Sequence, residues 1–190
     1  MREVFRSELQ EVQQRLVEMA DSVSVIMEKA SGAFLGNDIA KADEAIALSE
    51  ANEEKALSLD ELVIKILAQQ SPVARDLRVL VSALRISASL ERMGALAGHI
   101  AAIARYRFPG SAVPDSLRKT FEEMGTLDAQ LAKKVAGVLR NTDVDQARAI
   151  QAEDERVDEL HRNVFEIVLS DTWKENAMFT VDVTLASRYF

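Results

Sequence analysis

The longest helical pattern in the chain covers residues 72–107 and reads PVARDLRVLVSALRISASLERMGALAGHIAAIARYR. It has no internal Gly-Pro break. Ser71-Pro72 is typical of a helix start, because serine caps helices and proline is tolerated at the first helical position. At about 1.5 Å per residue, this helix would be roughly 54 Å long. We therefore expect it to be the architectural centre of the molecule.

Winding this helix at about 100° per residue places its apolar side chains in two stripes on opposite sides. The first stripe holds Val73, Leu77, Leu80, Val81, Leu84, Ala88 and Ala95. The second holds Val79, Ile86, Leu90, Met93, Ala97 and Ile100. A helix that is apolar on two sides is expected to lie between neighbours. Glu91 falls on the first stripe, so its carboxylate is expected to face the core.

The composition favours long helices and excludes several kinds of chemistry. Seven glycines and three prolines among 190 residues leave little material for turns. The absence of cysteine excludes disulfides and thiolate chemistry. A net charge of −8 argues against nucleic-acid binding, which requires phosphate neutralisation. No apolar run is long enough to span a membrane, and the charged N-terminus is unlike a secretory leader, so the expected compartment is the cytoplasm.

The same periodicity predicts helices over residues 2–34, 38–70, 116–140, 143–170 and 175–190. Short joints make consecutive helices antiparallel neighbours. The sequence therefore predicts an all-α fold with six long helices, arranged as two tandem, pseudo-symmetric, antiparallel three-helix bundles.

The expected division of the chain is a first repeat over residues 1–108, a linker over 109–116 and a second repeat over 117–190. The linker region contains two of the three prolines. The halves align at an offset of 105, which matches Asp38 with Asp143. The last helical pattern stops at Phe190 without a capping residue, and we expect that helix to continue beyond it.

Acidic residues on the predicted helices suggest a metal site. Asp154 and Asp158 form an i,i+4 pair, and Asp154 is expected within the apolar stripe of its helix. Glu53 and Glu91 are expected to face each other similarly in the first bundle. A hard cation bridging carboxylates from two helices would offset the repulsion between them. The alternative interpretation is that arginine or lysine pairs with these acids, or that they reach solvent.

Arg78, Arg85 and Arg92 recur at seven-residue spacing, and His99 continues the series. Seven residues are nearly two turns, so these side chains form a basic ridge. The ridge suits an acidic partner surface; the alternative is a solvated face with internal ion pairs. His99 and His161 are candidate ligands or phosphoacceptors, with a structural role as the alternative. No nucleophile arrangement or phosphate-binding loop is present, so catalysis is not expected.

The segments PVARDLR, SALRI and LERMG in the first half, and DERVDELH and VDVTLASRYF in the second, make the chain similar to the PhoU family of phosphate-signalling proteins. ERMGALA and AAIARYRFP resemble its actinobacterial branch. The resemblance implies two tandem three-helix bundles in a cytoplasmic homodimer. It also implies negative regulation of phosphate uptake and of the phosphate-starvation response. The implied partners are the ATPase of a phosphate ABC transporter, at the membrane only through that partner, and a sensor histidine kinase.

The family motif E/D-x-x-x-D holds iron or zinc clusters in some members. Asp154 and Asp158 match this motif fully. In the first repeat Ser49 replaces the leading acid before Glu53, and Ala95 stands where an aspartate usually follows Glu91. The first site is therefore expected to be eroded. The main hypothesis is a regulator that acts by protein contacts; the alternatives are a metal-dependent carboxylate enzyme and a phosphotransfer module using His99 or His161.

Overall fold

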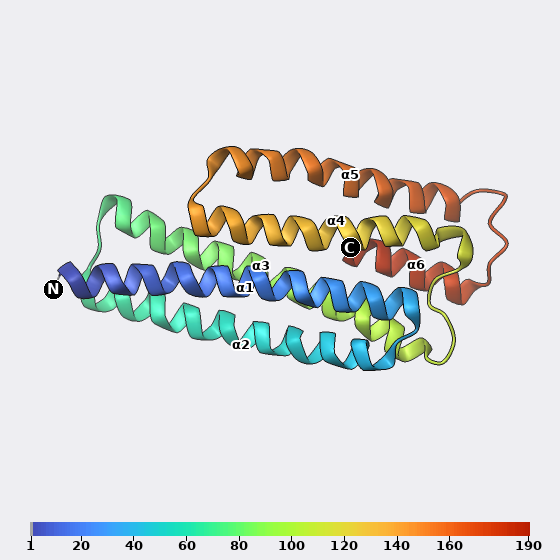
Figure 1. Ribbon diagram of the computed structural model, residues 1–190, viewed down its shortest axis with the longest axis horizontal. Helices are drawn as coiled ribbons and strands as arrows, with labels where there is room; N and C mark the ends of the chain where they lie inside the picture. Colours follow the sequence, from blue (N-terminus) through green and yellow to red (C-terminus); the bar gives the residue numbers. More distant parts are fainter. Residues whose placement is uncertain (1) are drawn as a thin grey trace.

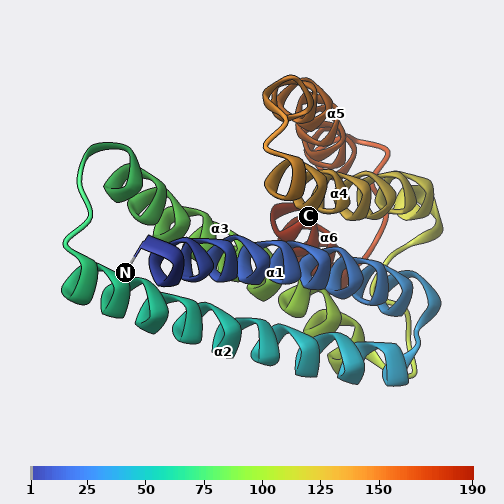
Figure 2. The ribbon, with the colours of Figure 1, turned by 60° about the vertical axis from the view of Figure 1, so that its left-hand side comes forward.

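The computed structural model describes residues 2–190, which fold into six helices. Their bounds are α1 Arg2–Gly36, α2 Ile39–Gln70, α3 Ala74–Arg107, α4 Asp115–Asn141, α5 Val144–Val168 and α6 Ala177–Tyr189. Helices α1 and α4 pack side by side in the middle, α2 and α3 pack against α1, and α5 packs against α4 (Figures 1 and 2). The predicted all-α fold of two tandem three-helix bundles is confirmed. Residue 1, the start of the predicted first repeat, lies outside the described residues.

The two halves begin their second helices in the same way. The side chains of Asp38 and Asp143, 105 residues apart in sequence, each accept a hydrogen bond from the backbone N–H three residues further on. The residues before them, Asn37 and Thr142, have φ angles of 52° and 55°. Aspartate is a preferred N-cap because its carboxylate satisfies a free N–H of the first turn. The same local chemistry therefore ends one helix and starts the next in both repeats.

The repeats meet along α1 and α4, where equivalent positions touch. The hydroxyl of Ser24 donates a hydrogen bond of 3.0 Å to the carbonyl of Ala129, again 105 residues away. Nearby, a Cβ added at Gly125 would lie 2.3 Å from the Oγ of Ser31. Only glycine fits an approach this close. The contact between α1 and α4 thus lies on the pseudo-symmetry axis.

The hydrophobic core is continuous across the two halves. One cluster of buried side chains draws on all six helices, and a second draws on α1, α2, α3 and α4. In the first cluster the rings of Phe34 on α1 and Phe121 on α4 lie 5.2 Å apart, and Phe190 packs edge-on 6.1 Å from Phe34. Apolar burial therefore ties the repeats to each other as well as holding each one together.

The start of α3 differs from the prediction. Ser71 is in the left-handed conformation, with φ 43°, and ends α2 instead of capping α3. Helix α3 begins at Ala74, after Val73, which is extended and offers no side-chain cap. Because Ser71 ends α2, Pro72 lies in the connection between the two helices and precedes the first turn of α3.

Of the two apolar stripes predicted for α3, most of the first is exposed, whereas Leu90, Ala97 and Ile100 of the second lie in the core. The buried residues form one stripe that runs through small side chains: Leu80, Ala83, Ser87, Leu90, Gly94, Ala97, Gly98, Ile100, Ala101 and Ala104. Large residues near the start of the helix are exposed instead, namely Val73, Leu77, Val79 and Val81. The buried stripe consists largely of small side chains because α2 packs closely against this side of α3. A Cβ at Gly94 would lie 2.8 Å from the amide nitrogen of Asn52, so the absence of a side chain here lets α2 approach.

Candidate functional site

In the first repeat, the predicted metal residues Glu53 and Glu91 do not form a site. Glu53 is exposed on α2 and Glu91 is only partly buried on α3, so the expected core-facing carboxylate is not found. The interface between these helices is occupied by Ser49 and Asn52. Ser49 donates a hydrogen bond to the carbonyl of Gly94 at 3.0 Å, and Asn52 donates one to another α3 carbonyl at 3.2 Å. The serine that replaces the motif's leading acid therefore joins two helices.

In the second repeat, Asp154 and Asp158 lie on the solvent side of α5. Both are exposed, whereas the buried residues of this helix are Val157, Leu160 and Val164. The prediction that Asp154 lies within the apolar stripe is wrong, because the buried face of the helix is centred on Val157, Leu160 and Val164, and Asp154 lies beside that face. Two exposed carboxylates one turn apart repel each other only weakly in water.

The described residues do not supply a ligand set for iron or zinc. Residues 2–190 contain no group of three or more histidine, aspartate or glutamate side chains placed to share one ion. Protein sites for zinc normally use three or four ligands, and carboxylate-bridged di-iron sites use more. The expectation of a bound iron or zinc stays a prediction.

Sequence reasoning missed one acid, Asp128 on α4. Its Oδ2 atom is buried and has no hydrogen-bond partner in the described chain. Burial, together with the charge of Asp154 on the adjacent α5, raises the pKa of Asp128 from 3.8 to about 8. The signal was available: the buried positions Phe121, Met124 and Ala132 share a helical spacing that places Asp128 on the same face. At neutral pH, this carboxyl holds its proton.

The two histidines have different surroundings. Nδ1 of His161 lies 2.6 Å from the hydroxyl of Ser187 and 2.8 Å from its carbonyl oxygen, so α6 holds this ring in place. His99 is exposed on α3 and packs edge-on against Tyr189, with ring centres 5.1 Å apart. These contacts favour the structural interpretation for His161 and leave His99 accessible.

The predicted basic ridge is exposed along α3. Arg78, Arg85 and Arg92 all lie at the surface, and none makes an ion pair within residues 2–190. Arg78 also borders a largely apolar groove of about 710 Å³ between α1, α3 and the joint of α4 and α5. The alternative of internal ion pairing is therefore wrong for these three arginines. Their charges are available to a partner.

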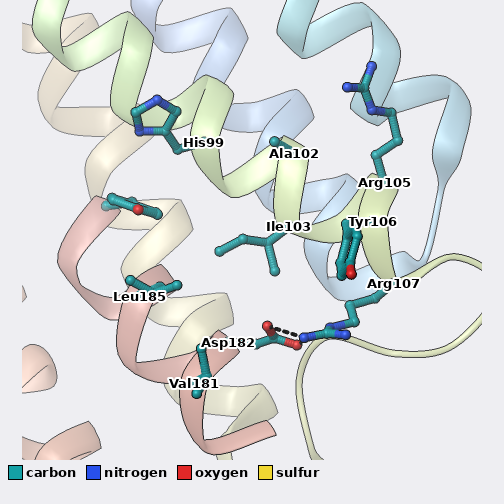
Figure 3. A pocket seen from close by; sticks show the side chains of 10 residues that line it. His99, Ala102, Ile103, Arg105, Tyr106, Arg107, Val181, Asp182 and Leu185 are labelled. Carbon is teal, nitrogen blue, oxygen red and sulfur yellow. Dashed lines mark hydrogen bonds and ion pairs between the residues drawn. The ribbon is translucent and has the colours of Figure 1, made fainter. Parts of the chain in front are cut away.

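The other end of α3 forms a cavity with α6. It has a volume of about 820 Å³ and lies between His99, Ile103 and Tyr106 on one side and Val181 and Leu185 on the other (Figure 3). Its opening faces solvent, and its lining is mainly apolar. A cavity of this size suits a large apolar side chain or a small molecule.

An ion pair closes one end of this cavity. Arg107 on α3 donates two hydrogen bonds to the carboxylate of Asp182 on α6, and the Nη2–Oδ1 distance is 2.9 Å (Figure 3). This hydrogen bonding raises the pKa of Arg107, so the guanidinium stays charged. Asp182 is buried, and among residues 2–190 its only charged partner is Arg107. The pair fixes α6 against α3 and satisfies the one carboxylate in the lining.

Comparisons with known proteins agree with this architecture. The family model described as "PhoU domain" matches residues 16–104 and 121–190, one stretch in each repeat. The chain is 37% identical over 190 residues to "Phosphate-specific transport system accessory protein PhoU homolog 2" of Mycobacterium tuberculosis, covering 100% of this chain and 89% of that protein. A homologue 1 from Mycobacterium leprae is 35% identical over the same length, covering 86% of that protein.

Solved structures share the fold. The crystal structure of PhoU from Pseudomonas aeruginosa superposes with a TM-score of 0.86 at 22% identity, covering 97% of this chain and 89% of that one. The phosphate transport system regulatory protein PhoU from Streptococcus pneumoniae gives a TM-score of 0.84 at 20% identity, covering 97% and 87%. At these identities, the likeness shows the fold alone. Within the part of the chain that the structure describes, no helix is both long and apolar enough to cross a membrane.

Proposed function

Because this chain belongs to the PhoU family, we propose that it is an accessory protein of a phosphate transport system that represses phosphate uptake and the phosphate-starvation response. It does so through contacts with the ATPase of a phosphate ABC transporter and with a sensor histidine kinase, as a homodimer in the cytoplasm. The observation that carries the proposal is the 37% identity over the whole chain to named accessory proteins of this system.

The surface of α3 supports action by protein contacts. Three exposed arginines that make no ion pair within the described residues lie on one face of a chain whose net charge is −8. Such a local reversal of charge attracts acidic partner surfaces and speeds their association. We propose that Arg78, Arg85 and Arg92 bind the ATPase or the kinase, and that the protein works without catalysing a reaction.

The test is a deletion of the gene with complementation. In phosphate-rich medium, the deletion strain should express phosphate-starvation genes, and the wild-type gene should restore repression. A triple variant, Arg78→Glu, Arg85→Glu and Arg92→Glu, should fail to restore it. The control carries the same charge change on other exposed arginines: Arg6→Glu, Arg148→Glu and Arg162→Glu. Normal repression in the deletion strain would overturn the proposed function.

A further inference from the structure

Helix α6 is apolar on its outer side as well as its inner side. Val183 and Ala186 are buried in the core. Met178, Val181 and Leu185 recur at helical spacing on the opposite side, where Val181 is 54% exposed. A helix of a soluble protein normally presents polar residues to water. The outer stripe of α6 is therefore an unpartnered apolar face.

This face continues onto α3 and surrounds the cavity shown in Figure 3. Tyr106 at the end of α3 is 80% exposed, and Phe108 follows it at the surface. Ile103 and Leu185 face each other across the cavity. An exposed apolar patch around a cavity is typical of a surface that receives one large anchoring side chain from a partner.

The charges around the cavity indicate which charged groups a partner would present beside that anchoring side chain. Arg188, one turn after Leu185, has no carboxylate partner among the described residues; its nearest polar contact is a His161 nitrogen at 3.5 Å. Arg92 lies two turns before His99, roughly 10 Å along α3, and likewise makes no ion pair within residues 2–190. The one acid of the lining, Asp182, is neutralised by its ion pair. In the part of the chain that the structure describes, unpaired cations flank this face and no unpaired carboxylate lines the cavity.

We propose that the α3–α6 face binds a partner segment that places a large apolar side chain in the cavity and carboxylates against Arg92 and Arg188. This inference rests on the proposed function, because the segment belongs to a protein that the regulator contacts. A second copy of the chain fits less well. At this face it would bring the same cations together, because a two-fold contact uses the same patch on both copies.

The probe is a pair of fluorescein-labelled helical peptides of about 16 residues. Both carry leucine and phenylalanine at i, i+3, i+4 and i+7, as in helix-in-groove recognition; one has glutamate at its flanking positions and the other has lysine. By fluorescence anisotropy in 50 mM NaCl, the glutamate peptide should bind at least tenfold more tightly. Raising the salt concentration should weaken this binding, because screening shortens the range of the charge attraction.

Variants locate the binding. Leu185→Glu should raise the Kd of the glutamate peptide at least tenfold, and so should Arg92→Glu combined with Arg188→Glu. The matched control is Leu169→Glu at the end of α5, where Leu169 is 80% exposed and outside the cavity. Circular dichroism checks that each variant is folded. Equal affinity for the two peptides, binding of neither, or unchanged binding by Leu185→Glu would overturn the inference.

Two further measurements separate this inference from the proposed function. Sedimentation equilibrium tests whether a second copy of the chain occupies the α3–α6 face. A dimer that the substitution Leu185→Glu dissociates would overturn the proposal. Binding to the purified transporter ATPase and to the cytosolic part of the kinase tests the partners. If the glutamate peptide binds as expected but neither protein does, the surface stands and the named partners fail.

Discussion

Arg107 and Asp182 form a two-pronged ion pair between the C-terminal end of α3 and the middle of α6. The two residues are 75 positions apart in sequence and come from different repeats. Since the Asp182 side chain is only 6% exposed, the pair is largely removed from water. Breaking such a pair from one side leaves a charge without its partner.

Asp182→Ala should therefore lower the free energy of unfolding by about 2–3 kcal/mol. The measurement is urea unfolding followed by circular dichroism. The control is Asp145→Ala, which removes an ion pair to Arg148 in which both side chains are highly exposed. That change should cost less than about 0.5 kcal/mol. Equal losses in the two variants would contradict a special role for the buried pair.

The close contact between α1 and α4 gives a second prediction. Gly125→Ala should destabilise the protein by about 1–3 kcal/mol, because the new methyl group would overlap both the Oγ and the Cβ of Ser31. Gly36→Ala is the matched control, since a Cβ there meets nothing within 4 Å. Thermal unfolding of the two variants compares them directly. A Gly125→Ala protein as stable as Gly36→Ala would show that α4 shifts at no cost.

The helices and their repeat were predictable because the signals are local. Asp38 and Asp143 mark helix starts through bonds to N–H groups three residues away, and few glycines or prolines interrupt the pattern. The buried stripe of α3 was not predictable from hydrophobicity alone. Gly94 and Gly98 lie in the core because α2 comes close, and that approach depends on Asn52 and Ser49, which are distant in the sequence.

The candidate site was predicted only in part. The exposed ridge of arginines follows from a seven-residue spacing, which a single helix fixes. The cavity between α3 and α6 depends on how two helices from different repeats pack, and no spacing within one helix contains that information. The metal prediction rests on motif spacing, which places Asp154 and Asp158 on one helix without specifying what faces them.

Metal content gives the third prediction. The protein is stripped with EDTA, incubated with Fe²⁺ or Zn²⁺ and passed over a desalting column. Elemental mass spectrometry should then find well under one ion per chain. Asp154 and Asp158 offer only two exposed carboxylates, fewer than a stable zinc site uses. Retention of one or more ions per chain, lost in Asp154→Ala, would contradict this expectation and would favour the metal-dependent enzyme instead.

The fourth prediction concerns the pH dependence of stability and rests on Asp128. Burial raises the pKa of this carboxyl in the folded chain to about 8, whereas its ordinary value is 3.8. Between these values, the folded state keeps a proton that the unfolded state has released. The contribution of Asp128 to the free energy of unfolding is therefore fully present below about pH 4. It decreases as the pH rises above that value and is lost once the pH has passed through 8.

Asp128→Asn removes this titration while keeping the shape of the side chain. In EDTA-treated protein, the variant should match the wild type near pH 4 and should exceed its free energy of unfolding at pH 8 by on the order of 3 kcal/mol. Urea unfolding at several pH values measures the difference. Asp145→Asn, whose side chain is 93% exposed, is the control and should show no such trend. If the difference between wild type and Asp128→Asn does not grow with pH, then Asp128 is ionised in the folded protein, and α4 and α5 must separate enough to admit water to it.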